Sequence, residues 1–244
     1  MKHTCPIIVI EGGDASGKTL QTKMLAKKLR QQGKKVKIFD FPQYHTFYGK
    51  IIKAYLNGDF GPATKIDAFL ASVLYVMNRF EVVPQILRTQ KKYDVILMNR
   101  YYSANLIHQG AKIIGKKAKK RRIELFYFLE SLELDFFKIP KANLILYLHV
   151  PTLISQQLMI KEGRLKDQHE KDIAYAKRVE RTALWLCKIA KSNWKLIECS
   201  KDGKNILSPK EINEKIYNAI NLSLIHISEP TRLLSISYAV FCLK

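Results

Sequence analysis

Four residues near the N-terminus have the types and the spacing of a phosphate-binding loop. Gly12, Gly17, Lys18 and Thr19 fit the pattern G-x-x-x-x-G-K-[ST]. Glycines let the backbone wrap closely around a phosphate, and the N–H groups of the loop and of the following helix point at the anion. In such loops the lysine reaches the β- and γ-phosphates and the hydroxyl binds Mg²⁺. The predicted cradle for nucleotide phosphates comprises Gly12, Gly13, Asp14, Ala15, Ser16, Gly17, Lys18 and Thr19.

The sequence on either side of this loop has the pattern that the motif requires. A short, mostly β-branched apolar run at 7–10 precedes it and is typical of a buried strand. Leu20, Met24, Leu25 and Leu29 then recur at helical spacing until Gly33. The alternative is a chance match in a glycine-containing turn, but a turn alone does not need a strand before it and a helix after it.

Strands and helices alternate along the rest of the chain. Further strands are predicted at 35–40, 95–98, 144–150 and 194–199. Helices are predicted at 47–56, 64–92, 103–114, 116–137 and 167–191, and from Ser208 onward, with Pro84 bending or dividing the second of these. This alternation predicts a parallel sheet that is covered on both faces. Ligands of such sheets bind at the carboxyl ends of the strands, where the polar stretches 12–19, 41–44 and 99–109 begin.

Composition limits the classes of protein that the chain can belong to. It has 244 residues, 47% of them hydrophobic, and a net charge of +21, which favours anionic partners such as nucleotides. An ordinary lysine-rich surface would give the same charge. The four cysteines are scattered without a C-x-x-C pair, and no stretch is long and apolar enough for a membrane span. We therefore expect reduced thiols, no membrane association and a cytoplasmic location.

A change in composition along the chain predicts one domain followed by a C-terminal tail of different character. Residues 1–221 form the predicted domain, with a short, charged candidate lid at about 160–167. From 222 to 244 the lysine-rich texture gives way to Ser, Leu and Ile. We expect this tail to be foreign to the domain or disordered; a genuine extra helix or strand is the alternative.

Three motifs in this order resemble the thymidylate kinase family. They are the loop at 11–19, the run Phe41-Pro42-Gln43-Tyr44, and Asn99-Arg100-Tyr101 followed by Asn105 and His108-Gln109. The resemblance extends to about residue 220. It implies an α/β fold of the P-loop nucleoside monophosphate kinase type, with a five-stranded parallel sheet between helical layers and a short lid. It also implies transfer of the γ-phosphate of ATP to dTMP, Mg²⁺ as cofactor and a homodimer formed through parts of 47–58 and 64–90.

The same resemblance implies which residues bind dTMP. Asp14 corresponds to a residue that binds the 3′-hydroxyl and helps Thr19 to hold Mg²⁺, partly through water. Arg100 corresponds to the residue that grips the dTMP phosphate, and a guanidinium suits a bidentate phosphate contact. The implied dTMP site comprises Asp14, Gln43, Tyr44, Tyr75, Arg79, Arg100, Asn105, His108 and Gln109.

Individual positions in this set have simpler structural explanations as well. Tyr75 would stack on thymine and Arg79, one helical turn later, would hydrogen-bond the base; core packing and solvation are the alternatives. Asn105 corresponds to the amide that contacts the pyrimidine edge. His108 lies where the family often guards against ribose, but a lone histidine could equally be a structural donor.

The chain departs from the family pattern at two places. Asn99 and Ala104 stand where the family usually has aspartate and commonly has serine. The phosphate-binding loop also lacks an arginine, and family members of that kind supply the transition-state cation from the lid. Arg164 is the candidate, and the predicted catalytic residues are therefore Lys18, Arg100, Arg164 and Asp14.

Three other functions remain to be compared with this one. A deoxynucleoside kinase shares the loop but needs a carboxylate base beside a hydroxyl, whereas Arg100 and Tyr44 converge where a phosphate would lie. A nucleic-acid-binding P-loop protein is suggested by the basic run at 116–122, although nucleic acid is not the expected partner. A catalytically weakened relative is suggested by Asn99, but the intact Lys18 and Thr19 argue against it.

Overall fold

A five-stranded parallel sheet forms the centre of the molecule. The computed structural model describes residues 5–161 and 172–227. The strands are β1 (Ile7–Gly12), β2 (Val36–Asp40), β3 (Val95–Asn99), β4 (Leu144–His149) and β5 (Trp194–Glu198), in the spatial order β2-β3-β1-β4-β5. All six residues of β1 are buried, because this central strand has neighbours on both edges and helices on both faces. The predicted α/β fold with a parallel sheet is confirmed.

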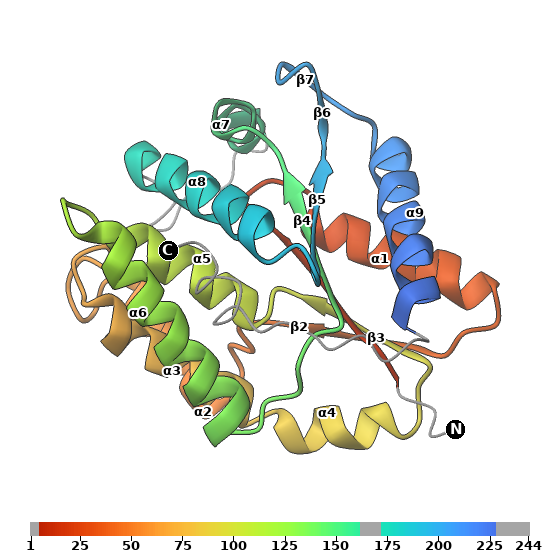
Figure 1. The fold of residues 1–244 in the computed structure, drawn as a ribbon, viewed down its shortest axis with the longest axis horizontal. Helices are drawn as coiled ribbons and strands as arrows, with labels where there is room; N and C mark the ends of the chain where they lie inside the picture. The colour runs from red at the N-terminus through yellow and green to blue at the C-terminus, as the bar shows by residue number, and fades with distance from the viewer. Residues whose placement is uncertain (1–4, 162–171, 228–244) are drawn as a thin grey trace.

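One face of the sheet is covered by α1 (Lys18–Gln31) and α9 (Pro209–Ile227), and Ile154 of α7 (Thr152–Lys161) joins the same core. Leu25 of α1 and Ile216 of α9 are fully buried against Ile8 and Ile10 of β1. Figure 1 shows α1 and α9 side by side on this face. This layer fixes the start of α1, and with it the loop that joins α1 to β1.

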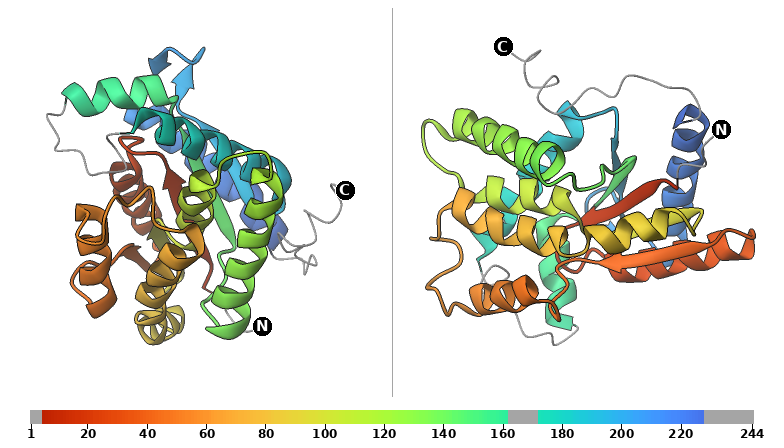
Figure 2. Two further views of the ribbon diagram at one scale, coloured as in Figure 1. Left: turned by 90° about the vertical axis from the view of Figure 1, so that its left-hand side faces the viewer. Right: turned by 90° about the horizontal axis from the view of Figure 1, so that it is seen from below.

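The opposite face carries a larger set of helices. They are α3 (Ala68–Phe80), α4 (Val83–Gln90), α5 (Tyr102–Lys112), α6 (Ala118–Glu130) and α8 (Ile173–Ile189), with α2 (Phe47–Asn57) packed outside α3. Ile7 and Val9 of β1 pack against this layer, so alternate side chains of one strand serve the two cores. The two views of Figure 2 show α2 and α3 on the far side of the molecule from α9.

The helix boundaries follow from capping residues and one proline. Asp67 accepts hydrogen bonds from the N–H groups of Phe69 and Leu70, so α3 begins at Ala68 and not at the predicted residue 64. Pro84 stands in the first turn of α4, and the predicted long helix is divided before it. The predicted capping box of α9 is confirmed, since Ser208 and Glu211 exchange hydrogen bonds of 2.8 and 3.3 Å.

Several local expectations were wrong. β5 is not the last strand, because a two-stranded hairpin of β6 (Ser200–Lys201) and β7 (Asn205–Ile206) follows it. The helix that ends near residue 137 is α-helical only to Glu130 and continues as the π-helical segment η1 (Ser131–Phe136). Leu20 is 48% exposed although its spacing suggests the buried face of α1.

The lid and the tail fall largely outside the described part of the chain. Helix α7 ends at Lys161, within the predicted lid of 160–167, and Arg164 lies outside the described residues. Helix α9 runs past the predicted domain boundary at 221 and ends at Ile227, whereas 228–244 lie outside the description. The boundary therefore does not coincide with the end of an element, and the foreign origin of the tail stays a prediction.

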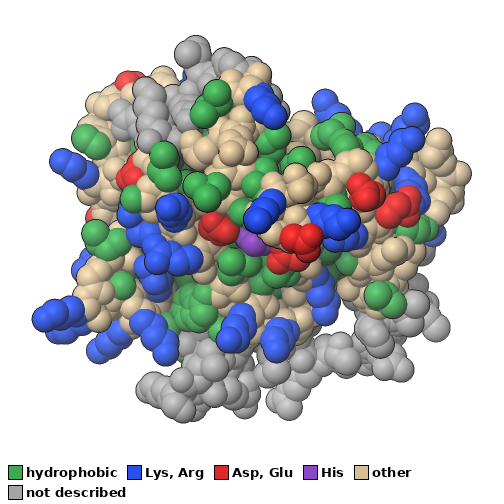
Figure 3. Space-filling view, turned by 90° about the horizontal axis from the view of Figure 1, so that it is seen from above, with side chains coloured by type: hydrophobic (Ala, Val, Ile, Leu, Met, Phe, Trp, Pro, Cys, Tyr) green, Lys and Arg blue, Asp and Glu red, His purple; other side chains and the backbone are tan. Residues whose placement is uncertain are grey.

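The face of the molecule shown in Figure 3 carries more basic than acidic side chains. On the face shown in Figure 3, lysine and arginine side chains lie in several separate groups, with a few acidic side chains between them. Within residues 5–161 and 172–227, no helix is long and apolar enough to span a lipid bilayer.

Candidate functional site

The loop between β1 and α1 has the backbone of a phosphate cradle. Gly17 caps α1 in a left-handed conformation with φ 78°, which glycine adopts without steric cost. A Cβ on Gly12 would lie 2.5 Å from Ser16 Oγ and 2.9 Å from the carbonyl oxygen of Leu148, so only glycine fits there. The Nζ of Lys18 donates to the carbonyl of Gly13 at 2.6 Å and thereby curls over the loop. The residues therefore fit a bound phosphate chain.

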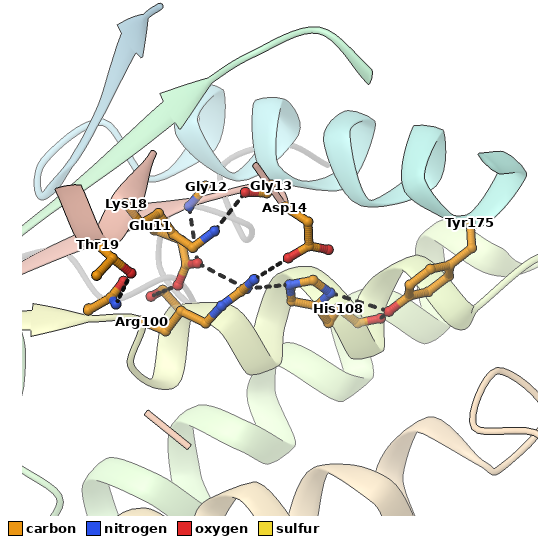
Figure 4. Close-up of polar contacts among 11 residues, drawn as sticks. Glu11, Gly12, Gly13, Asp14, Lys18, Thr19, Arg100, His108 and Tyr175 are labelled. Carbon is orange, nitrogen blue, oxygen red and sulfur yellow. Dashed lines mark hydrogen bonds and ion pairs between the residues drawn. The ribbon is translucent and has the colours of Figure 1, made fainter. Parts of the chain in front are cut away.

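Arg100 comes from the tip of the neighbouring strand and points at this loop. Its backbone has φ 61° and its N–H donates to the carbonyl of Ile10 at 3.1 Å, which ties the turn after β3 to β1. Its Nη2 lies 2.7 Å from Asp14 Oδ1 and its Nη1 lies 3.6 Å from Glu11 Oε1 (Figure 4). Burial opposes the charge of Arg100, yet Asp14 and Glu11 leave its pKa raised. Arg100 is thus a charged group that faces the same crevice as Lys18.

His108 extends this network to helix α8. Its Nε2 lies 2.8 Å from Nη1 of Arg100, and because a guanidinium only donates, this nitrogen must be the unprotonated one. The proton is then on Nδ1, which lies 3.4 Å from the hydroxyl of Tyr175; that hydroxyl donates to the backbone carbonyl of His108 at 2.9 Å. Figure 4 shows His108 between Arg100 and Tyr175. His108 is therefore a neutral acceptor that helps to aim Arg100.

A cavity that is partly open to solvent lies beside Arg100, and the empty space between its walls is about 690 Å³ with the open solvent at its mouth included. It brings together eight of the nine residues predicted for dTMP: Asp14, Tyr44, Tyr75, Arg79, Arg100, Asn105, His108 and Gln109. Gln43 does not line it; its backbone N–H and carbonyl instead bond to the side chain of Asn78 at 3.0 and 3.3 Å.

Two residues of the cavity wall carry amide oxygens that have no hydrogen-bond partner among the described residues. These oxygens, Asn105 Oδ1 and Gln109 Oε1, are buried. A buried acceptor without a partner costs free energy unless a ligand supplies a donor. The N3–H of a pyrimidine base such as thymine is a donor of that kind. Both residues line the cavity, whose wall also carries the aromatic rings of Phe41, Tyr44, Tyr75 and Tyr101.

Two residues that sequence reasoning missed hold the cavity together. Glu133 of η1 forms a bidentate ion pair with Arg79, at 2.6 and 2.7 Å, with both side chains at most 3% exposed. The same carboxylate accepts from Asn105 Nδ2 at 3.3 Å. Asn78 lines the cavity and bonds to Thr46 at 2.8 Å as well as to Gln43. Glu133 had no sequence signal, whereas Asn78 stands directly before Arg79 on a helix already assigned to the site.

The hydroxyl of Thr19 takes part in a separate polar cluster at the ends of β2 and β3. Asn99 Nδ2 donates to Thr19 Oγ1 at 3.1 Å and to Asp40 Oδ1 at 2.7 Å. Oxygen ligands of this kind suit Mg²⁺, which is bound by one or two protein groups together with phosphates and water. In the described part of the chain no group of three metal-ligating His, Cys, Asp or Glu side chains occurs.

A second cluster lies where β4 leads into α7. His149 lies between Glu180 of α8, at 2.8 Å, and Glu198 of β5, at 2.7 Å. The hydrogen bond to Glu180 raises the pKa of His149. Burial tends to raise the pKa of Glu180, but its bonds to His149 and Thr152 leave that pKa lowered. Because Thr152 begins α7, this cluster ties the start of α7 to α8.

Comparisons with known proteins agree on one family. A family model described as thymidylate kinase matches residues 10–208. The human thymidylate kinase is 26% identical over 200 residues, covering 80% of this chain and 82% of that protein. The thymidylate kinase of Brachyspira hyodysenteriae is 30% identical over 168 residues, covering 67% and 74%. A solved structure of thymidylate kinase from Candida albicans has a TM-score of 0.70 and 20% identity, over 91% of this chain and 94% of that one.

The Arg79–Glu133 pair predicts an effect on stability. Replacing Glu133 with Ala leaves a buried guanidinium without its counterion, and we expect the free energy of unfolding to fall by about 3–5 kcal/mol. Urea denaturation measures the change. Glu124→Gln, at an exposed position of α6, is the matched control and should change little. A loss no larger than that of the control would mean that the ion pair does not stabilise the fold.

The His149 cluster predicts a pH dependence of stability. The pKa of His149 is raised in the fold, so its stabilising contribution is complete below about pH 6.5, the usual histidine value, and is lost as pH rises through the raised value. We expect His149→Gln to be less stable than the parent chain at about pH 6, with the difference shrinking toward about pH 9. Urea denaturation at both pH values measures this. A difference that grows with pH would contradict the assignment.

Proposed function

The chain belongs to the thymidylate kinase family, and from that membership we propose how its residues divide the work of phosphorylating dTMP. As a nucleoside monophosphate kinase of this family, it transfers the γ-phosphate of ATP to dTMP and releases dTDP and ADP. The observation that carries the proposal is the position of Arg100, which points across the crevice at the loop that holds Lys18. Two phosphate-binding groups that face each other are what transfer between two phosphorylated nucleotides requires.

The loop at 12–19 binds the phosphates of ATP. Its N–H groups and the start of α1 surround the anion, and Lys18 leaves the carbonyl of Gly13 to reach the β- and γ-phosphates. The positive charge of Lys18 thereby stabilises the negative charge on the phosphoryl group during transfer. Asp14, within the same loop, contacts the sugar of the acceptor while it also orients Arg100.

The cavity beside Arg100 binds dTMP. Arg100 grips the acceptor phosphate, with Tyr44 at the rim of the cavity. Tyr75 stacks on thymine, and the unpartnered oxygens of Asn105 and Gln109 accept from the base edge. Arg79 keeps N–H groups beyond the two that bind Glu133, and these remain for the base.

No general base is needed for the chemical step. The attacking oxygen belongs to a phosphate that is already ionised at neutral pH, so positioning and charge stabilisation carry the rate. When Mg²⁺ is bound, it neutralises charge on the phosphates that react. We propose that Thr19 and Asp14 contribute to holding it, partly through water, and that Asn99 contributes no charge.

A deoxynucleoside kinase and a nucleic-acid-binding protein, two of the three alternatives, are less well supported. In the deoxynucleoside kinase reaction a carboxylate must take a proton from a hydroxyl, but Asp14 and Glu11 both lie beside the guanidinium of Arg100. A nucleic-acid groove needs basic side chains along one track, whereas the charges on the face in Figure 3 lie in separate groups.

Assembly and location are further proposals. We propose a homodimer formed through 47–58 and 64–90, because α2 and α3 expose Phe47 and Leu70 at 68% and 67%. Sedimentation velocity of the purified protein tests this, and a monomer would contradict it.

We propose a cytoplasmic location, with which the free thiols of Cys5, Cys187 and Cys199 agree. Fluorescence microscopy of the tagged protein checks the compartment.

A coupled assay of ADP release tests the reaction. With ATP as donor, we expect turnover with dTMP and little with thymidine or the other nucleoside monophosphates. Arg100→Ala should lower kcat/KM for dTMP by about a hundredfold or more, because a charge-assisted phosphate contact is lost. Equal turnover with thymidine and dTMP would favour the deoxynucleoside kinase instead.

The predicted role of Arg164 can be tested separately. We propose that it supplies the transition-state cation, which the loop at 12–19 lacks. Arg164→Ala should then lower kcat by about two orders of magnitude or more, with the affinity for dTMP nearly unchanged. Steady-state kinetics and a direct dTMP titration separate the two quantities. Lys161→Ala is the control for loss of a nearby charge, and unchanged kcat in Arg164→Ala would place the role elsewhere.

A further inference from the structure

A carboxylate lies beside Thr19 although the strand tip next to it carries an amide. Strands β2 and β3 are parallel neighbours, and Asp40 pairs with Asn99 in their register. Both residues therefore stand at the carboxyl end of the sheet. The amide of Asn99 bridges the carboxylate of Asp40, at 2.7 Å, and the hydroxyl of Thr19, at 3.1 Å.

The orientation of this amide follows from its partners. A carboxylate accepts hydrogen bonds and donates none, so the NH₂ group of Asn99 must face Asp40. Oδ1 of Asn99 is then left buried and without a partner among the described residues. A buried acceptor without a partner costs free energy, and a water molecule of a hydrated cation near Thr19 would satisfy it.

The charges around Thr19 single out Asp40. In P-loop enzymes the loop hydroxyl holds Mg²⁺ together with a carboxylate near a strand end. Glu11 and Asp14 lie beside Arg100, which offsets their charge. Asp40 is exposed and forms no ion pair with any described residue; its hydrogen bond comes from the uncharged Asn99. Its negative charge is therefore available to a cation beside Thr19.

We propose that Asp40, at the end of β2, is the residue whose carboxylate attracts and orients the hydrated Mg²⁺ at Thr19. Asn99 transmits this effect: it fixes Asp40 and Thr19 relative to each other and offers its free oxygen to a metal-bound water. The family pattern has its acidic residue at the tip of β3, where Asn99 stands here. In this chain the carboxylate lies instead at the tip of β2, on the other side of the hydrogen bond between Asn99 and Asp40. This inference rests on the proposed function only for the presence of a nucleotide-bound cation.

Binding of Mn²⁺ to the enzyme–ADP complex tests the inference without turnover. The free Mn²⁺ signal in electron paramagnetic resonance is followed during titration of the whole chain in the presence of ADP. Asp40→Asn should weaken Mn²⁺ binding by about tenfold or more, the usual effect of losing an outer-shell partner. Binding of ADP without metal should not weaken, because the substitution removes a negative charge near phosphates.

Two further variants provide the controls. The double variant Asp40→Asn with Asn99→Asp returns the carboxylate to the other side of the same hydrogen bond, and we expect Mn²⁺ affinity to recover most of the loss. Asp59→Asn removes an exposed carboxylate after α2 and should leave the affinity unchanged. Asp40 would be an ordinary solvated residue if Asp40→Asn bound Mn²⁺ as the parent does, or if Asp59→Asn lost as much.

The outcome is separable from that of the proposed function. If the parent chain does not phosphorylate dTMP but Asp40→Asn still weakens Mn²⁺ binding, the function is wrong and the metal assignment stands. If dTMP is phosphorylated and Asp40→Asn binds Mn²⁺ normally, the proposed function stands and the metal assignment is wrong.

Discussion

The site depends on one guanidinium held between two carboxylates. The side chain of Arg100 is only 18% exposed, a position in which an arginine without counterions would be costly. Asp14 and Glu11 supply that compensation, and His108 accepts the remaining hydrogen bond on the same side. The arrangement keeps Arg100 extended toward the phosphate-binding loop before any ligand arrives. In the proposed function, an anionic phosphate would meet a cation that is already placed, so little conformational entropy would be lost on binding.

The sheet order makes this placement possible. β1 lies between β3 and β4, so the loop after β1 and the turn after β3 leave the sheet at adjacent points. The left-handed backbone of Arg100, together with the bond from its N–H to Ile10, directs its side chain toward β1. A residue with φ above zero is strained unless its surroundings hold it, and here the neighbouring strand does so. The two groups that we propose to bind phosphate are thus positioned by the register of buried strands.

The sequence was sufficient for the fold and for the residues whose role is local. The loop motif, the five strands and the division at Pro84 follow from short-range patterns that physics constrains tightly. Most of the cavity wall followed from the family resemblance. Glu133 could not be predicted, because its contact with Arg79 joins residues 54 positions apart through a π-helical turn. The same holds for the bond between Asp40 and Asn99, which depends on strand order and register and not on any local motif.

The two long-range contacts that the sequence concealed have a common physical origin. In each contact, a polar side chain of the proposed site would be costly to leave without a partner, and it is paired with a residue from a distant element. Glu133 neutralises Arg79 and holds Asn105, while its position on η1 lets the carboxylate reach both helices α3 and α5. Asn99 plays the corresponding part between Asp40 and Thr19. An uncharged amide at that point avoids placing two like charges on adjacent strand tips, where their repulsion would oppose the folded register. The substitution that looks like a lost catalytic acid is therefore consistent with a site whose charge is held one strand away.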